Sequence, residues 1–64
     1  MGWKPEVKVE GQWNANALVF ATRKEAELSA RSLMMRWFLV TDTRAVETGD
    51  DVNYKIEDGR EARL

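Results

Sequence analysis

The side chains that could do chemistry are few and lack a catalytic partner. The 64-residue chain contains neither histidine nor cysteine, so it lacks the commonest acid–base catalyst and the usual zinc ligands. Ser29 and Ser32 have no base beside them to activate a hydroxyl nucleophile. The four glycines are scattered and form no phosphate-binding loop. We therefore expect no enzymatic activity, no cofactor and no small-molecule substrate.

Carboxylates in two turns are the remaining candidates for binding a cation. Asp50 and Asp51 follow Gly49, and Asp58 precedes Gly59. Their spacing does not match the ligand positions of a calcium loop, whereas Asp beside Gly is typical of tight turns. We expect these residues to shape turns, and we expect no metal site.

Three arginines offer a candidate contact with nucleic acid. Arg31, Arg36 and Arg44 could meet phosphates, and an exposed aromatic side chain could stack on a base. However, the net charge is −1, and basic and aromatic residues are not interleaved as in an RNP motif. Weak nucleic-acid binding through these arginines is therefore the alternative function, and not the preferred one.

The strongest functional signal is an excess of apolar residues in one segment. Residues 33–40 read LMMRWFLV, which is apolar on more than one side of a helix. At about 100° per residue, Leu28 and Met35 fall behind the stripe that should face the core. Lys24 and Arg31 flank them. We call Lys24, Leu28, Arg31 and Met35 the helix seam, and we predict that it binds a partner.

Trp13 is the second predicted partner contact. It lies between Gln12 and Asn14 in a polar segment. A tryptophan in such a segment either folds over the core or contacts a partner, and the sequence leaves both alternatives open.

Composition indicates a folded domain with a narrow margin of stability. Hydrophobic residues make up 44% of the chain and charged residues 33%, as in globular proteins. A chain this short buries a small share of its surface, and without disulfides or metals it needs large aromatic core residues or self-association. No apolar run could span a bilayer and the N-terminus lacks a signal-peptide core. We expect a cytoplasmic homodimer that does not bind membranes.

Local patterns predict four strands and one helix. Alternating apolar residues predict strands over 3–10 and 52–57. Shorter apolar stretches predict strands over 17–20 and 42–48, with a turn over 11–16 and another at Asp58–Gly59. A short strand after residue 59 is left open.

A capping box formed by Thr22 and Glu25 predicts a helix from Arg23 to Trp37 or Phe38. Its core stripe is predicted to consist of Ala26, Ala30, Leu33 and Trp37.

The predicted fold is a single α+β domain over 1–64. It has the order ββαββ, with an antiparallel sheet and one helix packed on one face. The other face has no cover, so Val19 or Trp13 on that face would favour a second subunit there. Asn53 is unusual within a strand, and we expect it to orient a loop through hydrogen bonds.

The chain also resembles a family of small uncharacterised bacterial and phage proteins. The resemblance spans about residues 13–54. The matching residues are Trp13, Asn16, Leu18, Phe20, Thr22, Glu25, Ala26, Leu33, Arg36, Trp37, Asp42, Arg44, Val46, Glu47, Val52, Asn53 and Tyr54. The resemblance implies a compact α+β domain of bacterial or phage origin and no catalytic residue, because the family has no assigned activity.

Together, these observations favour a small non-enzymatic protein-interaction module. Such a module would serve as a phage or bacterial accessory or inhibitor protein, acting by binding and occlusion.

Overall fold

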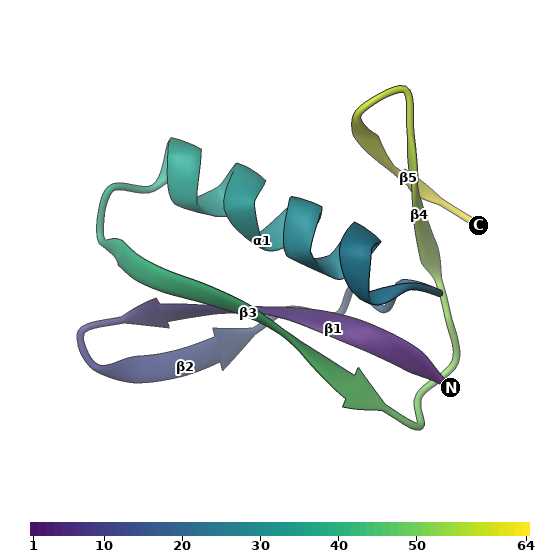
Figure 1. Ribbon diagram of the computed structural model, residues 1–64, viewed down its shortest axis with the longest axis horizontal. Coiled ribbons are helices and arrows are strands. Elements are labelled where there is room, and N and C mark those ends of the chain that lie inside the picture. The colour runs from purple at the N-terminus through teal and green to yellow at the C-terminus, as the bar shows by residue number, and fades with distance from the viewer.

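The chain folds into a three-stranded sheet with one helix on one face and a separate hairpin beside the helix (Figure 1). A computed structural model describes all 64 residues. The elements are β1 (Gly2–Val9), β2 (Gln12–Ala15), α1 (Arg23–Arg36), β3 (Val40–Thr48), β4 (Tyr54–Glu57) and β5 (Arg60–Arg63). The strand order is β2-β1-β3 in the sheet, and β4 pairs with β5. This architecture confirms the predicted α+β class and antiparallel pairing.

The first hairpin turns earlier than the sequence predicted. Glu10 and Gly11 have φ values of 53° and 81°, and Val9 pairs with Gln12 across this two-residue turn. Two consecutive positive φ angles are typical of the turns that match the twist of paired strands. The prediction of a turn over 11–16 was therefore wrong, and most of that segment is β2.

The segment before the helix contributes a single bridge and not a strand over 17–20. Phe20 and Trp3 each donate a backbone hydrogen bond to the other, both 2.8 Å long. Val19 is buried, and a Cβ atom added at Gly2 would lie 2.5 Å from Val19 Cγ1. Val19 lies on the Gly2 side of β1, which faces away from the helix, but the chain itself buries Val19 there, so it offers no apolar surface to a second subunit. Its backbone is held as well, because the Val19 carbonyl accepts hydrogen bonds from the Asn53 and Tyr54 N–H groups.

The helix begins where the capping box predicted. The Thr22 hydroxyl accepts a hydrogen bond from the Glu25 backbone N–H at 3.2 Å and donates one to the Glu25 carboxylate at 2.9 Å. The helix ends at Arg36, and the Trp37 N–H donates to the Leu33 carbonyl at 2.9 Å. The end therefore lies one or two residues before the predicted position.

The helix covers β1 and β3 but not β2. Its alanines permit close approach, because Ala26 and Ala30 are fully buried. The core between the layers contains Val7, Ala30 and Val40, with Val9 and Leu33 packed against them. Trp37 was predicted to belong to the core stripe, but its side chain is half-exposed. It points toward β2, against which the helix does not pack closely.

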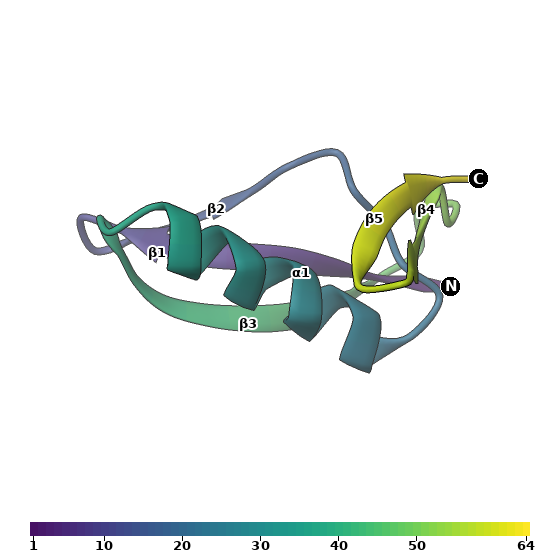
Figure 2. The same ribbon diagram turned by 90° about the horizontal axis from the view of Figure 1, so that it is seen from above.

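The last two strands form a sheet of their own and do not join the main one, which corrects the prediction of one sheet. Asp58 and Gly59, with φ values of 54° and 76°, form the predicted turn. They lead into β5, the strand that the sequence left open. The hairpin stands beside the N-terminal half of α1 (Figures 1 and 2).

Candidate functional site

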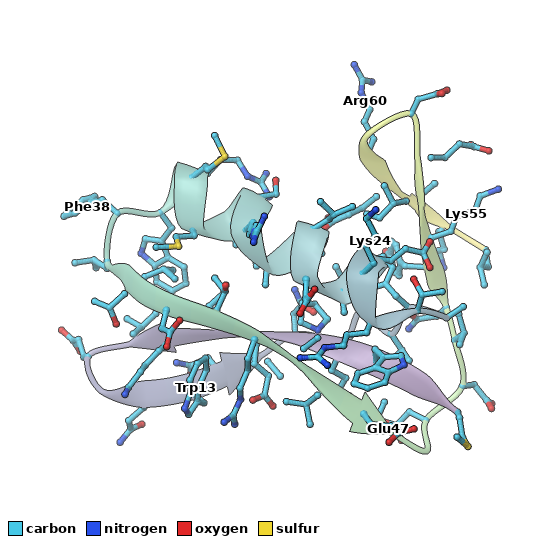
Figure 3. All side chains as sticks on the ribbon, viewed as in Figure 1. Trp13, Lys24, Phe38, Glu47, Lys55 and Arg60 are labelled. Atoms are coloured by element: carbon cyan, nitrogen blue, oxygen red, sulfur yellow. The ribbon has the colours of Figure 1, made fainter.

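The C-terminal end of α1 and the loop after it expose large apolar side chains. Phe38 is 90% exposed and Met35 is 88% exposed, and Figure 3 shows Phe38 at the outer tip of the molecule. Three neighbours, Met34, Trp37 and Leu39, are exposed by 42–44%. We call these five residues the apolar end. They are exposed because the chain reverses here to enter β3, and no other element lies beyond the reversal.

Positive charge borders the apolar end. Residues 28–41 include Arg31 and Arg36 but no aspartate or glutamate. The Arg36 Nε donates to the Ser32 carbonyl at 3.3 Å, which holds the guanidinium against the last turn of the helix. The surface is therefore apolar at its centre and cationic at its rim.

The helix seam predicted from the sequence lies along one exposed side of α1. Lys24, Leu28 and Arg31 line a shallow pocket together with Glu27, and Met35 continues the row into the apolar end. The structure therefore brings the four seam residues together on one surface. Their role in binding stays a prediction.

Trp13 lies on the opposite face of the sheet from the helix. The Arg44 guanidinium carbon lies 4.0 Å from the centroid of the Trp13 ring, and the Lys8 Nζ lies 5.8 Å from it. Arg44 also pairs with Glu6, with 2.6 Å between Nη2 and Oε1. These two cations lie over the ring of Trp13, which Figure 3 shows below the sheet. Trp13 is therefore separated from the helix seam and lies among paired charges, so this face is not an apolar surface that needs a second subunit.

The three arginines of the nucleic-acid hypothesis do not share a surface. Arg31 and Arg36 lie on α1, whereas Arg44 lies on the uncovered face and is engaged by Glu6 and Trp13. A single nucleic-acid strand on one face could not contact all three. Nucleic-acid binding stays a prediction without an assembled site.

Polar contacts fix the C-terminal hairpin against the start of the helix. The Glu25 carboxylate accepts a hydrogen bond from the Ile56 N–H at 3.0 Å. That bond lowers the pKa of Glu25 below its usual 4.5, with a smaller contribution from Thr22 and against the opposing effect of burial. The Ser29 hydroxyl donates to the Glu61 carboxylate. Both contacts link α1 to the hairpin.

Asn53 orients the loop before β4, as the sequence predicted. Its side-chain oxygen accepts a hydrogen bond from the Val19 N–H and its amide nitrogen donates to the Ala17 carbonyl, each at 2.8 Å. The side chain thereby joins two segments that are more than 30 residues apart in the sequence.

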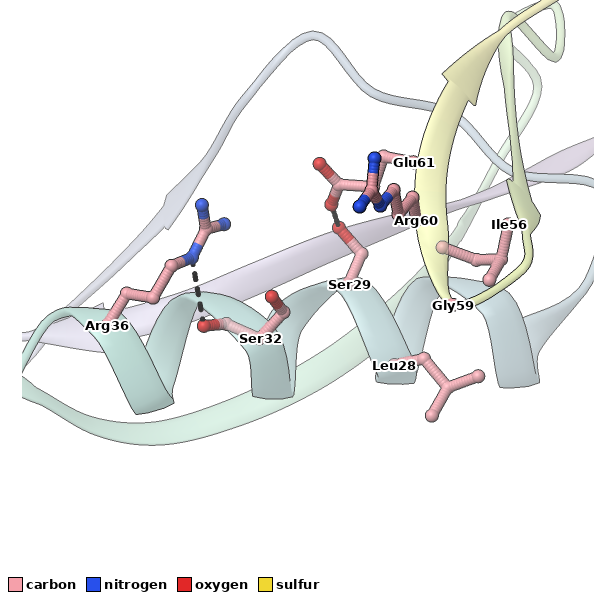
Figure 4. A pocket seen from close by; sticks show the side chains of 8 residues that line it. All are labelled: Leu28, Ser29, Ser32, Arg36, Ile56, Gly59, Arg60 and Glu61. Carbon is pink, nitrogen blue, oxygen red and sulfur yellow. Dashed lines mark hydrogen bonds between the residues drawn. The ribbon is translucent and has the colours of Figure 1, made fainter.

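A pocket of about 370 Å³ lies between α1 and the hairpin (Figure 4). It contains Arg36 and Arg60, but also the Glu61 carboxylate, which Ser29 already binds. The chain has no histidine that would activate Ser29 or Ser32 as a nucleophile. No cluster of three acidic side chains that could hold a metal ion is present, and no helix is long and apolar enough to cross a membrane.

The structure contains a second groove that the sequence analysis did not predict. This groove, of about 210 Å³, lies between α1 and β2 and is lined by Pro5, Val7, Asn14, Ala15, Asn16, Leu33 and Trp37. It was missed because the first hairpin was placed too late in the chain. A two-residue turn at Glu10–Gly11 would have been the signal that placed β2 beside it.

Comparison with known proteins gives no further assignment. No protein-family model, curated protein or solved structure matches the chain. The resemblance to small bacterial and phage proteins stays a prediction.

Proposed function

We propose that this chain is a small non-enzymatic protein-interaction module that binds a protein partner through the apolar end. The observation that carries the proposal is the almost complete exposure of Phe38 and Met35 on neighbouring turns of the chain. A contiguous exposed apolar surface with a polar rim is characteristic of protein-binding sites.

Burial of these side chains supplies the driving force. Complete burial of one Phe or Met side chain contributes about 1.5–3 kcal/mol, and both residues start almost fully exposed. Met adapts to irregular partner surfaces because it is flexible and polarizable. Trp37 adds a half-exposed aromatic side chain of the kind that is enriched among binding hot spots.

The partner is a protein surface with an apolar centre and acidic residues around it. Arg31 and Arg36 border the apolar end, and neither takes part in an ion pair within the chain. Opposite charges on the partner would steer association and exclude partners with basic rims. The helix seam extends this surface from Met35 back to Lys24. Binding here would act by occluding the partner's own apolar surface.

The test is affinity capture from host cells followed by binding measurements on the captured protein with point variants. Phe38→Asp removes an apolar side chain from the interface and places a negative charge opposite the partner's acidic residues. We therefore expect affinity to fall at least tenfold. Arg36→Glu should slow association and make it less sensitive to salt. A matched control is Leu64→Asp, because Leu64 is also exposed but lies at the C-terminus, away from the apolar end.

A captured partner whose binding is equally affected by Leu64→Asp and Phe38→Asp would contradict the proposal. So would a partner whose contact surface, once mapped, carries a basic rim.

A further inference from the structure

The outer edge of β3 carries backbone N–H and C=O groups without partners. Which residues carry them follows from the hydrogen bonds of β1. Along a strand, the peptide groups of successive residues point alternately to the two neighbouring strands. Trp3 exchanges hydrogen bonds with Phe20 on the β2 side, so the residues of β1 at even positions point to β3. Their β3 partners are Thr48, Val46, Arg44 and Asp42. Thr43, Ala45 and Glu47 therefore direct their N–H and C=O groups outward.

Little in the chain satisfies this edge. β3 has nine residues and is the last strand of the sheet. The Asp42 carboxylate accepts a hydrogen bond from the Thr43 N–H at 2.8 Å. The outward groups of Ala45 and Glu47 take part in no other backbone hydrogen bond. A long edge with free groups is a template for pairing with another strand.

We propose that a second copy of this chain pairs with β3 in antiparallel orientation, with Thr43 opposite Thr43 of the second copy. The two three-stranded sheets would then form one continuous six-stranded sheet. The strand edge of β3 contains no residue of the apolar end, and its pairing does not depend on the protein-binding function proposed above.

The charges on β3 select among the possible antiparallel registers, each of which we name by its centre, the residue that lies opposite its own copy. They favour the register centred on Thr43. A centre on Asp42 would place that carboxylate opposite its own copy, and a centre on Arg44 would place two guanidinium groups opposite each other. A centre on Ala45 would oppose Arg44 with Val46 and form no charge pair. The centre on Thr43 opposes Asp42 with Arg44 of the second copy, and the symmetry repeats the pair. Opposite charges directly across two strands are favourable and like charges unfavourable.

Arg44 has the capacity for this second carboxylate. Glu6 Oε1 occupies its Nε and one terminal nitrogen, at 2.7 and 2.6 Å. A guanidinium has five N–H donors, so donors remain for Asp42 of the second copy. Asp42 in turn would exchange its contact with Thr43 for the charge pair, and the freed Thr43 N–H would join the new ladder.

The position of the helix is compatible with such a pairing. In Figure 2 the N-terminal half of α1 lies on the outer side of β3, so a two-fold axis through this edge would place the two helices side by side and antiparallel. Leu33 and Trp37 face the β2 side, which leaves Glu27 and Arg31 nearer the second copy. Antiparallel helices would oppose these unlike charges.

Sedimentation velocity over a range of concentrations up to about 1 mM, which includes weak complexes, tests the proposal. We expect wild type to reach twice the chain mass of 7.4 kDa. Asp42→Arg creates two Arg–Arg oppositions, and Arg44→Asp creates two Asp–Asp oppositions, so each variant alone should sediment as a monomer. Mixed in equal amounts, they should form a heterodimer, because both opposed pairs then carry unlike charges.

Two further variants separate pairing from folding. Thr43→Pro removes an outward N–H, which an edge strand tolerates, and it should give a folded monomer by circular dichroism. Asp51→Arg makes the same charge change as Asp42→Arg outside the strand and should remain a dimer. A monomeric wild type would overturn the proposal and assign Asp42 the role of blocking the edge. The proposal would also be overturned if Thr43→Pro were still a dimer, or if Asp42→Arg and Arg44→Asp failed to form a heterodimer when mixed.

Discussion

The two ends of α1 are built in opposite ways. The N-terminal end, which we call the anchored end, is capped by Thr22 and tied to the C-terminal hairpin through Glu25 and Ser29. The apolar end has no element packed beyond it, and Phe38 and Met35 are almost fully exposed there. The polar side chains of the anchored end thus find partners within the chain, whereas Met35 and Phe38 of the apolar end do not.

This difference separates the region that stabilises the fold from the surface proposed to bind a partner. The hairpin is held at the anchored end by the hydrogen bonds of Glu25 and Ser29, together with the packing of Tyr54 beside the buried Phe20. At the other end, apolar area that could have stabilised the fold is left in water, at a cost that a protein of this size has little margin to bear. The account therefore predicts that changes at the anchored end alter folding and that changes at the apolar end alter binding.

The largest contrast is expected between the two phenylalanines. Phe20 is fully buried and lies 6.4 Å from Tyr54 between ring centroids, so Phe20→Ala should cost about 3–5 kcal/mol of unfolding free energy. Phe38→Ala should change it by less than about 0.5 kcal/mol, as expected for an exposed site. Urea unfolding followed by circular dichroism measures both, and equal losses would remove the contrast between the two ends.

A smaller loss is expected when the loop before β4 is released. Asn53→Ala leaves the buried Val19 N–H without its acceptor, which should cost about 1–3 kcal/mol. Asn14→Ala is the matched control, because Asn14 is exposed and bonds only to the nearby Gln12 carbonyl. If thermal unfolding gives the two variants the same midpoint, Asn53 does not hold the hairpin.

Glu25 should make the anchored end sensitive to acid. Its pKa is lowered in the fold, chiefly by the Ile56 N–H. Its contribution to stability is therefore complete above the usual carboxyl value of 4.5 and is lost as the pH falls through the lowered folded pKa. Glu25→Gln should cost about 1 kcal/mol at neutral pH and much less in acid.

Urea titrations at both pH values measure this effect, and amide exchange at Ile56 reports the hairpin directly. Glu47→Gln is the control, since Glu47 is exposed and makes no ion pair. A loss from Glu25→Gln that stays constant with pH would show that the carboxylate charge is not what holds β4.

Polar substitution of the apolar end itself is expected to change stability little. Met35→Lys combined with Phe38→Lys should leave the unfolding free energy within about 1 kcal/mol of wild type, the sum of two surface effects. Binding of a fluorescent apolar dye should fall, because the dye reports exposed hydrophobic surface. Unchanged dye binding would show that the exposed residues do not form a usable surface.

Local signals in the sequence were reliable where the residue types matched the geometry. Thr22 and Glu25 predicted the start of the helix, and Asp58–Gly59 predicted a turn, because aspartate and glycine tolerate positive φ. Glu10–Gly11 makes the same kind of turn, but glutamate is not typical of its first position. The first hairpin was therefore misplaced.

Tertiary placement was harder to predict. Alternation in residues 52–57 predicted a strand, which the structure forms over Tyr54–Glu57 only. Nothing local shows that β4 pairs with β5 instead of β1 or β3. The sequence left open whether Trp13 packs within the chain or contacts a partner. The contact of its ring with Arg44 depends on the register of three paired strands, which no local pattern shows. The exposure of Met35 followed from helical periodicity alone. That of Phe38 depends on where the helix ends and the chain reverses.

The most direct test of the central claim is site-specific photo-crosslinking in host cells. A photoreactive residue in place of Phe38 should yield a defined adduct with one partner protein, and Arg36→Glu in the same chain should reduce its yield. The same residue in place of Lys55, which is half-exposed on β4 near the anchored end, should give none. Equal adducts from both positions, or none from position 38, would contradict the assignment of the apolar end as a binding surface.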